Sequence, residues 1–205
     1  MADRSTQNRK TRTRDDFLDA ATLLFAERGY YGASLADVAA ELAVSKQAVL
    51  HRFASKERLY GEVLQRTAEH LERQFDEVTQ VEDSAEEQLL AFLLAVGSSE
   101  PGSSTRLLMR ELLDNAPRAE RAGTWYLKSF LEGLIERVRT VPGWEKASRP
   151  RALALAYQLL GAVNYHSISH ATLKAIFGER TYRSLEREFP KQLEATVRAA
   201  LRSPP

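Results

Sequence analysis

The feature that most constrains the fold is a pair of very short amphipathic runs near the N-terminus, separated by a brief break. The stretch VAAELAVSKQAVLHRFASKERLY, residues 38–60, contains this break and the start of a longer run. Apolar residues recur at helical spacing in each run, so each short run predicts a helix of about two turns. Two such helices joined by a tight turn lie roughly perpendicular, which is the geometry that lets one of them enter the major groove of DNA.

Capping residues support the boundaries of both short helices. Ser34 stands at the expected N-cap of the first helix, and Asp37 occupies the capping-box position. Ser45 is the N-cap candidate of the second helix, which should run from about Lys46 to Arg52. Five apolar side chains are predicted to hold the pair together: Val38, Leu42, Val44, Val49 and Phe53.

Helical patterns continue through the rest of the chain. No alternating β-branched run of strand length occurs, and breaks such as GSSEPGSS and VPGW have the Gly, Pro and Ser content of loops. Apolar positions from Phe17 to Phe25 predict a first helix that Gly29 ends, and Ser55 begins a long fourth helix. Further helices are expected at about 84–96, 104–114, 117–140, 149–177 and 181–202.

These patterns predict an all-α protein of about nine helices. An N-terminal three-helix helix-turn-helix domain would be joined by a linker helix to a larger C-terminal helical bundle. The expected organisation is a basic flexible arm over 1–11, the DNA-binding domain over 12–60 with its helix-turn-helix motif at 34–53, and a larger C-terminal domain over 61–205, whose ligand-binding and dimerisation roles are implied only by the resemblance described below. A chain of 205 residues is long enough to bury such cores.

Composition excludes several classes of site. There are no cysteines, which removes disulfides, thiolate metal sites and cysteine nucleophiles. The start, MADRSTQNRK, lacks an apolar stretch of signal-peptide length, and no apolar run is long enough to span a membrane, so a cytoplasmic protein is expected. The net charge is only +1, but basic residues crowd the start, where they form either a solvated tail or contacts with phosphates: Arg4, Arg9, Lys10, Arg12 and Arg14.

The outward side chains of the second short helix are suited to DNA. Gln47 can pair with adenine, Lys46 with guanine or a phosphate, and Ala48 can meet a thymine methyl group. His51 and Lys56 suit phosphates, although each lysine taken singly could be an ordinary solvated residue. The predicted DNA-contacting set is Ser34, Ser45, Lys46, Gln47, Ala48, Leu50, His51, Arg52 and Lys56.

Residues 12–64 resemble the DNA-binding domain of the TetR family of bacterial transcription regulators. The resemblance rests on the "VAAE" helix, the "VSK" turn, the "HRF" ending and the Lys-Glu-x-Leu-Tyr that opens the linker helix. Ala43 departs from the glycine usual at the turn, so either a positive φ there is strained by ~1 kcal/mol or the turn adopts helical-region geometry. Leu50 stands where the family commonly has a phosphate-binding tyrosine, and Gln47 where it often has glycine.

The resemblance also implies a C-terminal bundle that forms a homodimer and encloses a ligand pocket. The last two helices would build the dimer interface, although the same residues suit an intramolecular core: Leu153, Leu160, Ile168, Leu185, Phe189, Leu193 and Val197. A pocket for a mainly apolar molecule is predicted among the middle helices, with Asn164 or His166 to orient the ligand. Its lining would be Phe92, Met109, Leu113, Trp125, Tyr126, Phe130, Tyr157, Asn164 and Tyr165, which equally suit plain core.

The function predicted from the sequence is a ligand-responsive transcriptional repressor that binds a palindromic operator as a dimer and is released by a small effector, without a cofactor. Corepression is equally allowed by the physics. One alternative is a helix-turn-helix DNA-binding protein without an inducer. A helical enzyme is a remote alternative, because His166 and His170 have metal-binding spacing but no adjacent glutamate completes an HExxH motif.

Overall fold

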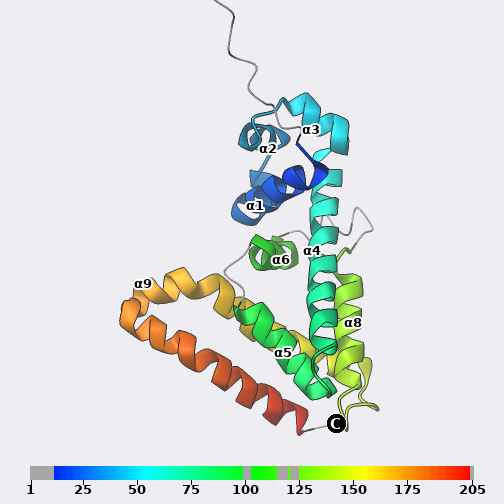
Figure 1. Ribbon diagram of the computed structural model, residues 1–205, viewed down its shortest axis with the longest axis vertical. Coiled ribbons are helices and arrows are strands. Elements are labelled where there is room, and N and C mark those ends of the chain that lie inside the picture. Colours follow the sequence, from blue (N-terminus) through cyan, green and yellow to red (C-terminus); the bar gives the residue numbers. More distant parts are fainter. Residues whose placement is uncertain (1–11, 99–102, 115–119, 121–124, 204–205) are drawn as a thin grey trace, which may run out of the picture. The chain divides into compact units, whose positions relative to one another are not determined.

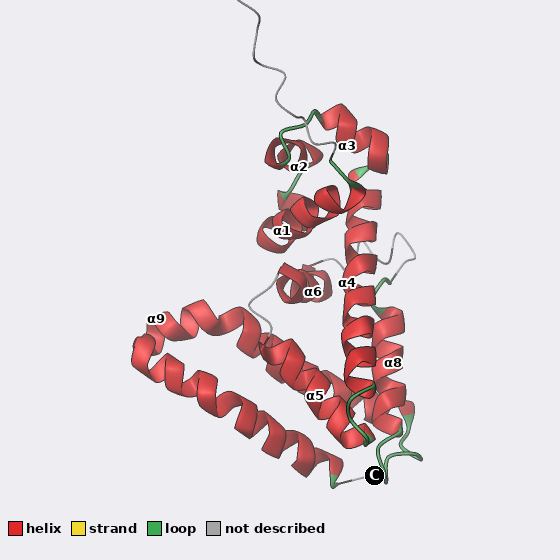
Figure 2. Cartoon of the chain, in the orientation of Figure 1, coloured by secondary structure: helices red, strands yellow, loops and turns green. Residues whose placement is uncertain are grey.

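The computed structural model describes residues 12–98, 103–114, 120 and 125–203, which form helices and turns and contain no strand (Figure 1, Figure 2). The all-α prediction is therefore confirmed. The predicted basic arm over 1–11 lies outside the described residues. In the described part of the chain the helices are α1 (Arg14–Gly32), α2 (Leu35–Glu41), α3 (Lys46–Phe53), α4 (Lys56–Thr79), α5 (Ala85–Ser98), α6 (Ser103–Asp114), α8 (Lys128–Arg139) and α9 (Arg149–Leu201).

Contacts divide the chain into two compact units, Met1–Val63 and Leu64–Pro205. The division falls inside α4, so this helix begins in the first unit and continues into the second. None of the described helices is long and apolar enough to cross a membrane.

The N-terminal unit is built around aromatic side chains from α1, α3 and α4. The ring of Phe25 meets that of Tyr60 edge-on at 4.8 Å, and Phe17 lies 6.0 Å from Phe53 between ring centroids. A capping box at Thr13, which the sequence analysis did not identify, starts α1. Gly29 breaks the helix as predicted, with φ 71°, although a further helical turn extends to Gly32.

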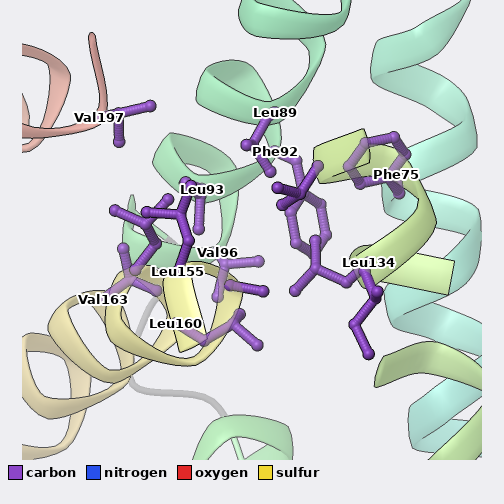
Figure 3. Close-up of a cluster of buried hydrophobic side chains, with 14 of the residues drawn as sticks. Phe75, Leu89, Phe92, Leu93, Val96, Leu134, Leu155, Leu160, Val163 and Val197 are labelled. Carbon is purple, nitrogen blue, oxygen red and sulfur yellow. The ribbon is translucent and has the colours of Figure 1, made fainter. Parts of the chain in front are cut away.

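The core of the C-terminal unit is centred on α5. Its residues Leu89, Phe92 and Leu93 are fully buried and point toward side chains of α4, α8 and both parts of α9 (Figure 3). Arg198 of α9 also donates hydrogen bonds to Glu86 at 3.0 Å and to Glu87 at 2.7 Å, at the start of α5. The second part of α9 is thus fixed to α5 by both packing and charge.

Residues 149–201, labelled α9, consist of two helical arms joined by a sharp break, as the predicted helices 149–177 and 181–202 require. Gly178 has φ 80° and ψ 160°, a conformation that strongly favours glycine, and there the chain turns back on itself (Figure 1). The ring of His166 in the first arm stacks on Phe189 in the second at 3.7 Å, and its Nε2 lies 3.2 Å from Glu186. Burial lowers the pKa of His166, and Glu186 opposes that shift.

The helix predicted over 117–140 is confirmed from Lys128 to Arg139 and is wrong at residues 125–127. Residues 125–127 form a turn, in which the N–H of Lys128 bonds to the carbonyl of Trp125 at 3.0 Å, and α8 starts at Lys128. Of the predicted N-terminal half, residues 117–119 and 121–124 lie outside the described residues. Helix α8 therefore begins directly after this turn.

Three residues predicted at the dimer interface belong instead to the core of a single chain. Leu160, Leu193 and Val197 are 6%, 4% and 0% exposed, within the cluster around α5. The α9 arms are packed against α5, which buries the apolar stripe that a separate pair of terminal helices would have offered to a partner. Of the rest, Ile168, Leu185 and Phe189 are partly buried and Leu153 is 40% exposed.

Replacing Leu193 with Ala should therefore destabilise the monomeric fold. We expect a loss of about 2–5 kcal/mol in the free energy of unfolding, because a buried leucine leaves a cavity. Chemical denaturation measures this loss. Leu113→Ala is the matched control, since Leu113 is 74% exposed and should change stability by less than about 0.5 kcal/mol. Equal effects of the two substitutions would contradict the core assignment.

Candidate nucleic-acid interface

The candidate interface is the outer face of α3, and hydrogen bonds at both short helices fix its position. The hydroxyl of Ser45 accepts the N–H of Ala48 at 3.2 Å and so caps α3. At α2, the N–H of Ser34 donates to the Asp37 carboxylate at 2.7 Å, while the Asp37 N–H donates to the Ser34 hydroxyl at 3.2 Å. Both predicted N-caps are confirmed, and each cap side chain satisfies one of the free N–H groups at the start of its helix.

The inner face of α3 is held by complete burial of two side chains. Val49 and Phe53 are 0% and 1% exposed, and α3 packs against α2, whose Val38 is also fully buried. Leu42 is buried as predicted, whereas Val44 is only partly covered because it lies in the turn between the helices. With its inner side anchored in this way, α3 presents a fixed outer surface.

Four side chains share the outer face of α3. Lys46 and Leu50 are one helical turn apart, as are Gln47 and His51, and all four are exposed. Ala48 is partly buried beside them. The face offers a cation, an amide that can both donate and accept hydrogen bonds, an imidazole and a small apolar patch. These groups can meet base edges and phosphates in a major groove.

Arg52 has a packing role that the sequence pattern did not reveal. Its guanidinium lies 5.1 Å from the centre of the Phe17 ring and donates to the carbonyl of Arg12 at 3.3 Å. Arg14 makes the reciprocal contact, 4.7 Å from the Phe53 ring, and pairs with Glu62. Arg14 and Arg52 thus hold α1 against α3. Both had been expected to face DNA or solvent.

Lys56 is held at the first turn of α4 by an aromatic ring. Its ammonium lies 4.5 Å from the centre of the Tyr30 ring, and the side chain is partly buried. Burial lowers the pKa of Lys56, and the nearby carboxylate of Asp37 opposes that shift. Ser55 caps this helix by accepting the N–H of Arg58 at 3.1 Å, which leaves Lys56 at a positive helix end with its charge in a defined position.

Alanines with positive φ stand on both sides of α3. Ala43 has φ 53° in the turn before it, and Ala54 has φ 62° directly after it. The strained alternative considered for Ala43 is therefore the observed one. Hydrogen bonds hold both turns: the Ala43 N–H donates to Ala40 at 3.1 Å, and the Ala54 N–H donates to Leu50 at 2.7 Å. The positive φ of Ala54 could not be predicted, because alanine is not a residue typical of such turns.

Most of the predicted pocket residues do not come together. Leu113, Trp125, Tyr157 and Tyr165 are 74%, 54%, 63% and 67% exposed, so they line no enclosed cavity within one chain. These four side chains point outward, a direction that residue type alone could not predict. Met109 and Tyr126 are partly buried, and Phe92 lies in the core.

A small cavity in the C-terminal unit does include Phe130 and Asn164 of the predicted set. Its free volume is about 10 Å³, and its lining comes from α4, α5, α6, α8 and α9: Leu71, Val96, Thr105, Leu108, Phe130, Leu160 and Asn164. His166, the other predicted orienting group, pairs with Glu186 instead. The described residues contain no cluster of three potential metal ligands.

An exposed stripe runs along the first arm of α9. Leu153, Tyr157, Gly161 and Tyr165 follow one another at four-residue spacing, and all are exposed. A Cβ atom placed on Gly161 would meet nothing within 4 Å. This stripe, rather than the buried Leu193 and Val197, is the apolar surface that α9 leaves uncovered.

Comparison with known proteins identifies the N-terminal unit. Residues 17–63 match the family model described as bacterial regulatory proteins, tetR family. The N-terminal domain of this chain belongs to the TetR family. The Ser34–Phe53 segment, with its two short helices α2 and α3, lies within the matched range.

Solved structures of other proteins share the fold of this chain. A transcriptional regulator from Rhodococcus sp. Rha1 is 20% identical, with TM-score 0.66 over 92% of this chain and 95% of that one. The fatty acid degradation regulator FadR from Bacillus halodurans is 18% identical, with TM-score 0.64 over 90% and 96%. AibR, solved with isovaleryl coenzyme A and operator DNA, is 22% identical, with TM-score 0.58 over 74% and 83%. The fold and these relatives are those of transcription regulators rather than enzymes. No curated protein matches the sequence.

Replacing Ala43 with Gly should stabilise this TetR-family domain. Glycine adopts φ 53° without the steric cost that alanine bears, so we expect a gain of roughly 1 kcal/mol in the free energy of unfolding. Ala40→Gly is the control, because Ala40 is exposed within α2 and the same change there should cost about 0.5–1 kcal/mol. Thermal or chemical unfolding compares the two. Loss of stability in both variants would show that Ala43 is not strained.

Proposed function

We propose that this protein is a repressor that binds a palindromic operator as a homodimer and leaves it when a small, mainly apolar molecule binds the C-terminal unit. The observation that carries the proposal is the exposed face of α3, with Lys46, Gln47, Leu50 and His51 on a helix whose other side is fully buried. A helix held in this way can be placed in the major groove without losing its own fold.

The side chains of α3 divide by their chemistry. Gln47 suits adenine, which offers a donor and an acceptor in the major groove, and Lys46 suits guanine or a phosphate. Leu50 presents an apolar surface to a thymine methyl group or a sugar. Lys56, fixed on Tyr30, would contact a phosphate, as would His51. Arg52 is expected to position α3 through Phe17 rather than to contact bases.

A dimer is proposed because one helix-turn-helix buries limited surface on DNA. Two copies related by a two-fold axis place two recognition helices about 34 Å apart, or a multiple of that, on one face of the duplex. The exposed stripe of Leu153, Tyr157, Gly161 and Tyr165 supports an interface on the first arm of α9. Gly161 would let the two helices approach closely, because it has no side chain between them.

Release by an effector follows from linkage. A molecule that binds one arrangement of the bundle more tightly than another shifts the population toward it. Leu71 of α4 lines the cavity, and the same helix begins at Lys56, so a change in the cavity wall acts on the helix that adjoins α3 in sequence. A protein of similar fold, AibR, was solved with isovaleryl coenzyme A and operator DNA, which supports control of DNA binding by a small molecule. A regulator of this kind would act in the cytoplasm.

Selection of bound duplexes from a random DNA pool tests the proposed function. We expect a palindromic site, since a symmetric dimer reads two equal half-sites. Gln47→Ala should relax discrimination at one base pair in each half-site, with little change elsewhere. Selection of an asymmetric site, or of no site at all, would sink the proposal.

The second candidate function is that of a DNA-binding protein with the same N-terminal helix-turn-helix unit and no effector. The small size of the cavity, about 10 Å³, favours it. An operator complex that no small molecule dissociates would support this candidate, whereas ligand-dependent release would exclude it.

Lys56→Ala should weaken binding to all DNA sequences alike. Loss of one phosphate contact should reduce the slope of log K against log salt by about one. Binding titrations at several salt concentrations measure the slope. Lys56→Arg should restore it, and Lys128→Ala, which removes an exposed lysine of α8, should leave it unchanged. An unaltered slope in Lys56→Ala would rule out the contact.

Tyr157→Glu should produce a folded monomer that binds the operator poorly. Tyr157 is 63% exposed, so the charge is tolerated in a single chain but not in an apolar interface. Light scattering and circular dichroism report mass and helicity. Val81→Glu, at a residue 77% exposed outside α9, should remain dimeric. A dimeric Tyr157→Glu would move the interface away from this stripe.

A further inference from the structure

The cavity of the C-terminal unit carries information about the chemistry of the effector. Its described walls are hydrocarbon except at two places, Thr105 of α6 and Asn164 of α9. Thr105 is partly buried, while Asn164 is only 4% exposed. Asn164 therefore stands as a single amide in an otherwise apolar wall.

The side-chain oxygen of Asn164 is buried and accepts no hydrogen bond from the described residues. Such atoms are rare, because burying an unpaired amide oxygen is costly and most native structures avoid it. One turn further along α9, the hydroxyl of Ser167 is also buried without a partner among these residues, and Ser167 is 6% exposed. Two unsatisfied polar atoms on neighbouring turns point to a missing partner at this part of α9.

A single water molecule would be poorly held beside Asn164. The free volume of about 10 Å³ is at the lower limit for a single water, which also needs about two to four polar neighbours. The described side chains of the cavity supply only Asn164 and Thr105. A ligand group that replaces so poorly held a water and makes the same hydrogen bond gains affinity.

We propose that the effector is an uncharged molecule with an apolar body and one hydroxyl or amide head group, which donates a hydrogen bond to the Asn164 oxygen. This inference rests on the proposed function and names the class of molecule that would bind there. Leu108, Phe130 and Leu160 supply the surface for the apolar body.

The charge of the head group follows from the wall. A carboxylate would face the acceptor oxygen of Asn164, and no described residue that lines the cavity carries a cation to neutralise it. An ammonium group would likewise be buried without a carboxylate. Burying an unpaired ion is far more costly than burying a neutral group. A free fatty acid therefore does not suit this wall, whereas an alcohol, an amide or a lactam does.

The cavity must widen to admit such a molecule. Because its walls come from α4, α5, α6, α8 and α9, a ligand with an eight-carbon body would separate several helices at once. Binding would select an open arrangement of the bundle that is rare without ligand, and the observed affinity would be reduced by that rarity. Weak binding of generic probes is expected for this reason.

Octan-1-ol, octanamide, octanoate and octylammonium are the probes, added at pH 7.5 to the full-length protein. Calorimetric titration and the shift of the unfolding midpoint measure binding. We expect the alcohol and the amide to bind at least about fivefold more tightly than either ion. In Asn164→Leu this preference should fall by about fivefold, the value of one neutral hydrogen bond. The control Gln65→Leu, at an exposed residue of α4, should keep the preference.

Asn164→Leu has a second expected effect that needs no probe. Since it replaces an unpaired buried amide with hydrocarbon of similar size, the unliganded protein should unfold at a higher temperature than the wild type. If leucine does not fit, Asn164→Ala provides the same test of probe preference with a larger cavity. An unchanged probe preference in both variants would show that the Asn164 amide does not hold the head group, and would overturn the proposal.

Other outcomes are equally decisive. Preferential binding of octanoate or octylammonium, equal binding of all four probes, or no binding would overturn the inference on an uncharged effector. These failures leave the proposed function standing if the wild type still selects a palindromic DNA site. Absence of a selected site would instead count against the proposed function, whatever the probes do.

Discussion

The helix that would meet DNA is too short to be stable by its own hydrogen bonds, and the rest of the N-terminal unit compensates for this. An isolated helix needs about 12–15 residues to be even marginally stable in water, and α3 has 8. Its order comes from the Ser45 cap and from complete burial of Val49 and Phe53. The same burial decides which side chains are left outside, so stability and recognition have one physical origin.

Two features occur together around α3: backbone strain at Ala43 and Ala54, and contacts of two arginines with aromatic rings. Ala43 and Ala54 both have positive φ, a conformation that alanine adopts only when surrounding contacts enforce it. Arg52 lies over the Phe17 ring and Arg14 over the Phe53 ring, so α3 is packed against α1 directly before Ala54 in the sequence. Glycine at position 43 would remove the backbone strain of the folded state, but it would also increase the conformational entropy of the unfolded chain. The direction of α3 is therefore held by packing rather than by turn preference.

The sequence could predict local structure well and the direction of side chains poorly. Ser34, Ser45 and Gly29 are signals that act over a few residues, so caps and breaks were predicted correctly. Leu193 and Val197 were assigned to an interface because a helical stripe shows that a face is buried but not what covers it. Arg52 contacts Phe17 and Lys56 contacts Tyr30. These aromatic rings are far away in sequence, so no local pattern predicts the contacts.

Asn164 is an exception to the apolar packing of the C-terminal unit, because its buried side-chain oxygen has no hydrogen-bond partner among the described residues. A leucine there would extend the apolar face of α9 and remove an unpaired oxygen, so the present residue makes the unliganded bundle less stable than it could be. Destabilised polar groups of this kind concentrate at functional sites, where a ligand supplies what the fold lacks. A bundle that is completed only by its effector also has a reason to change arrangement when the effector binds, because the hydrogen bond exists in one state and not in the other. The unpaired amide would thus determine which molecule is bound and why its binding affects α4, which lines the same cavity.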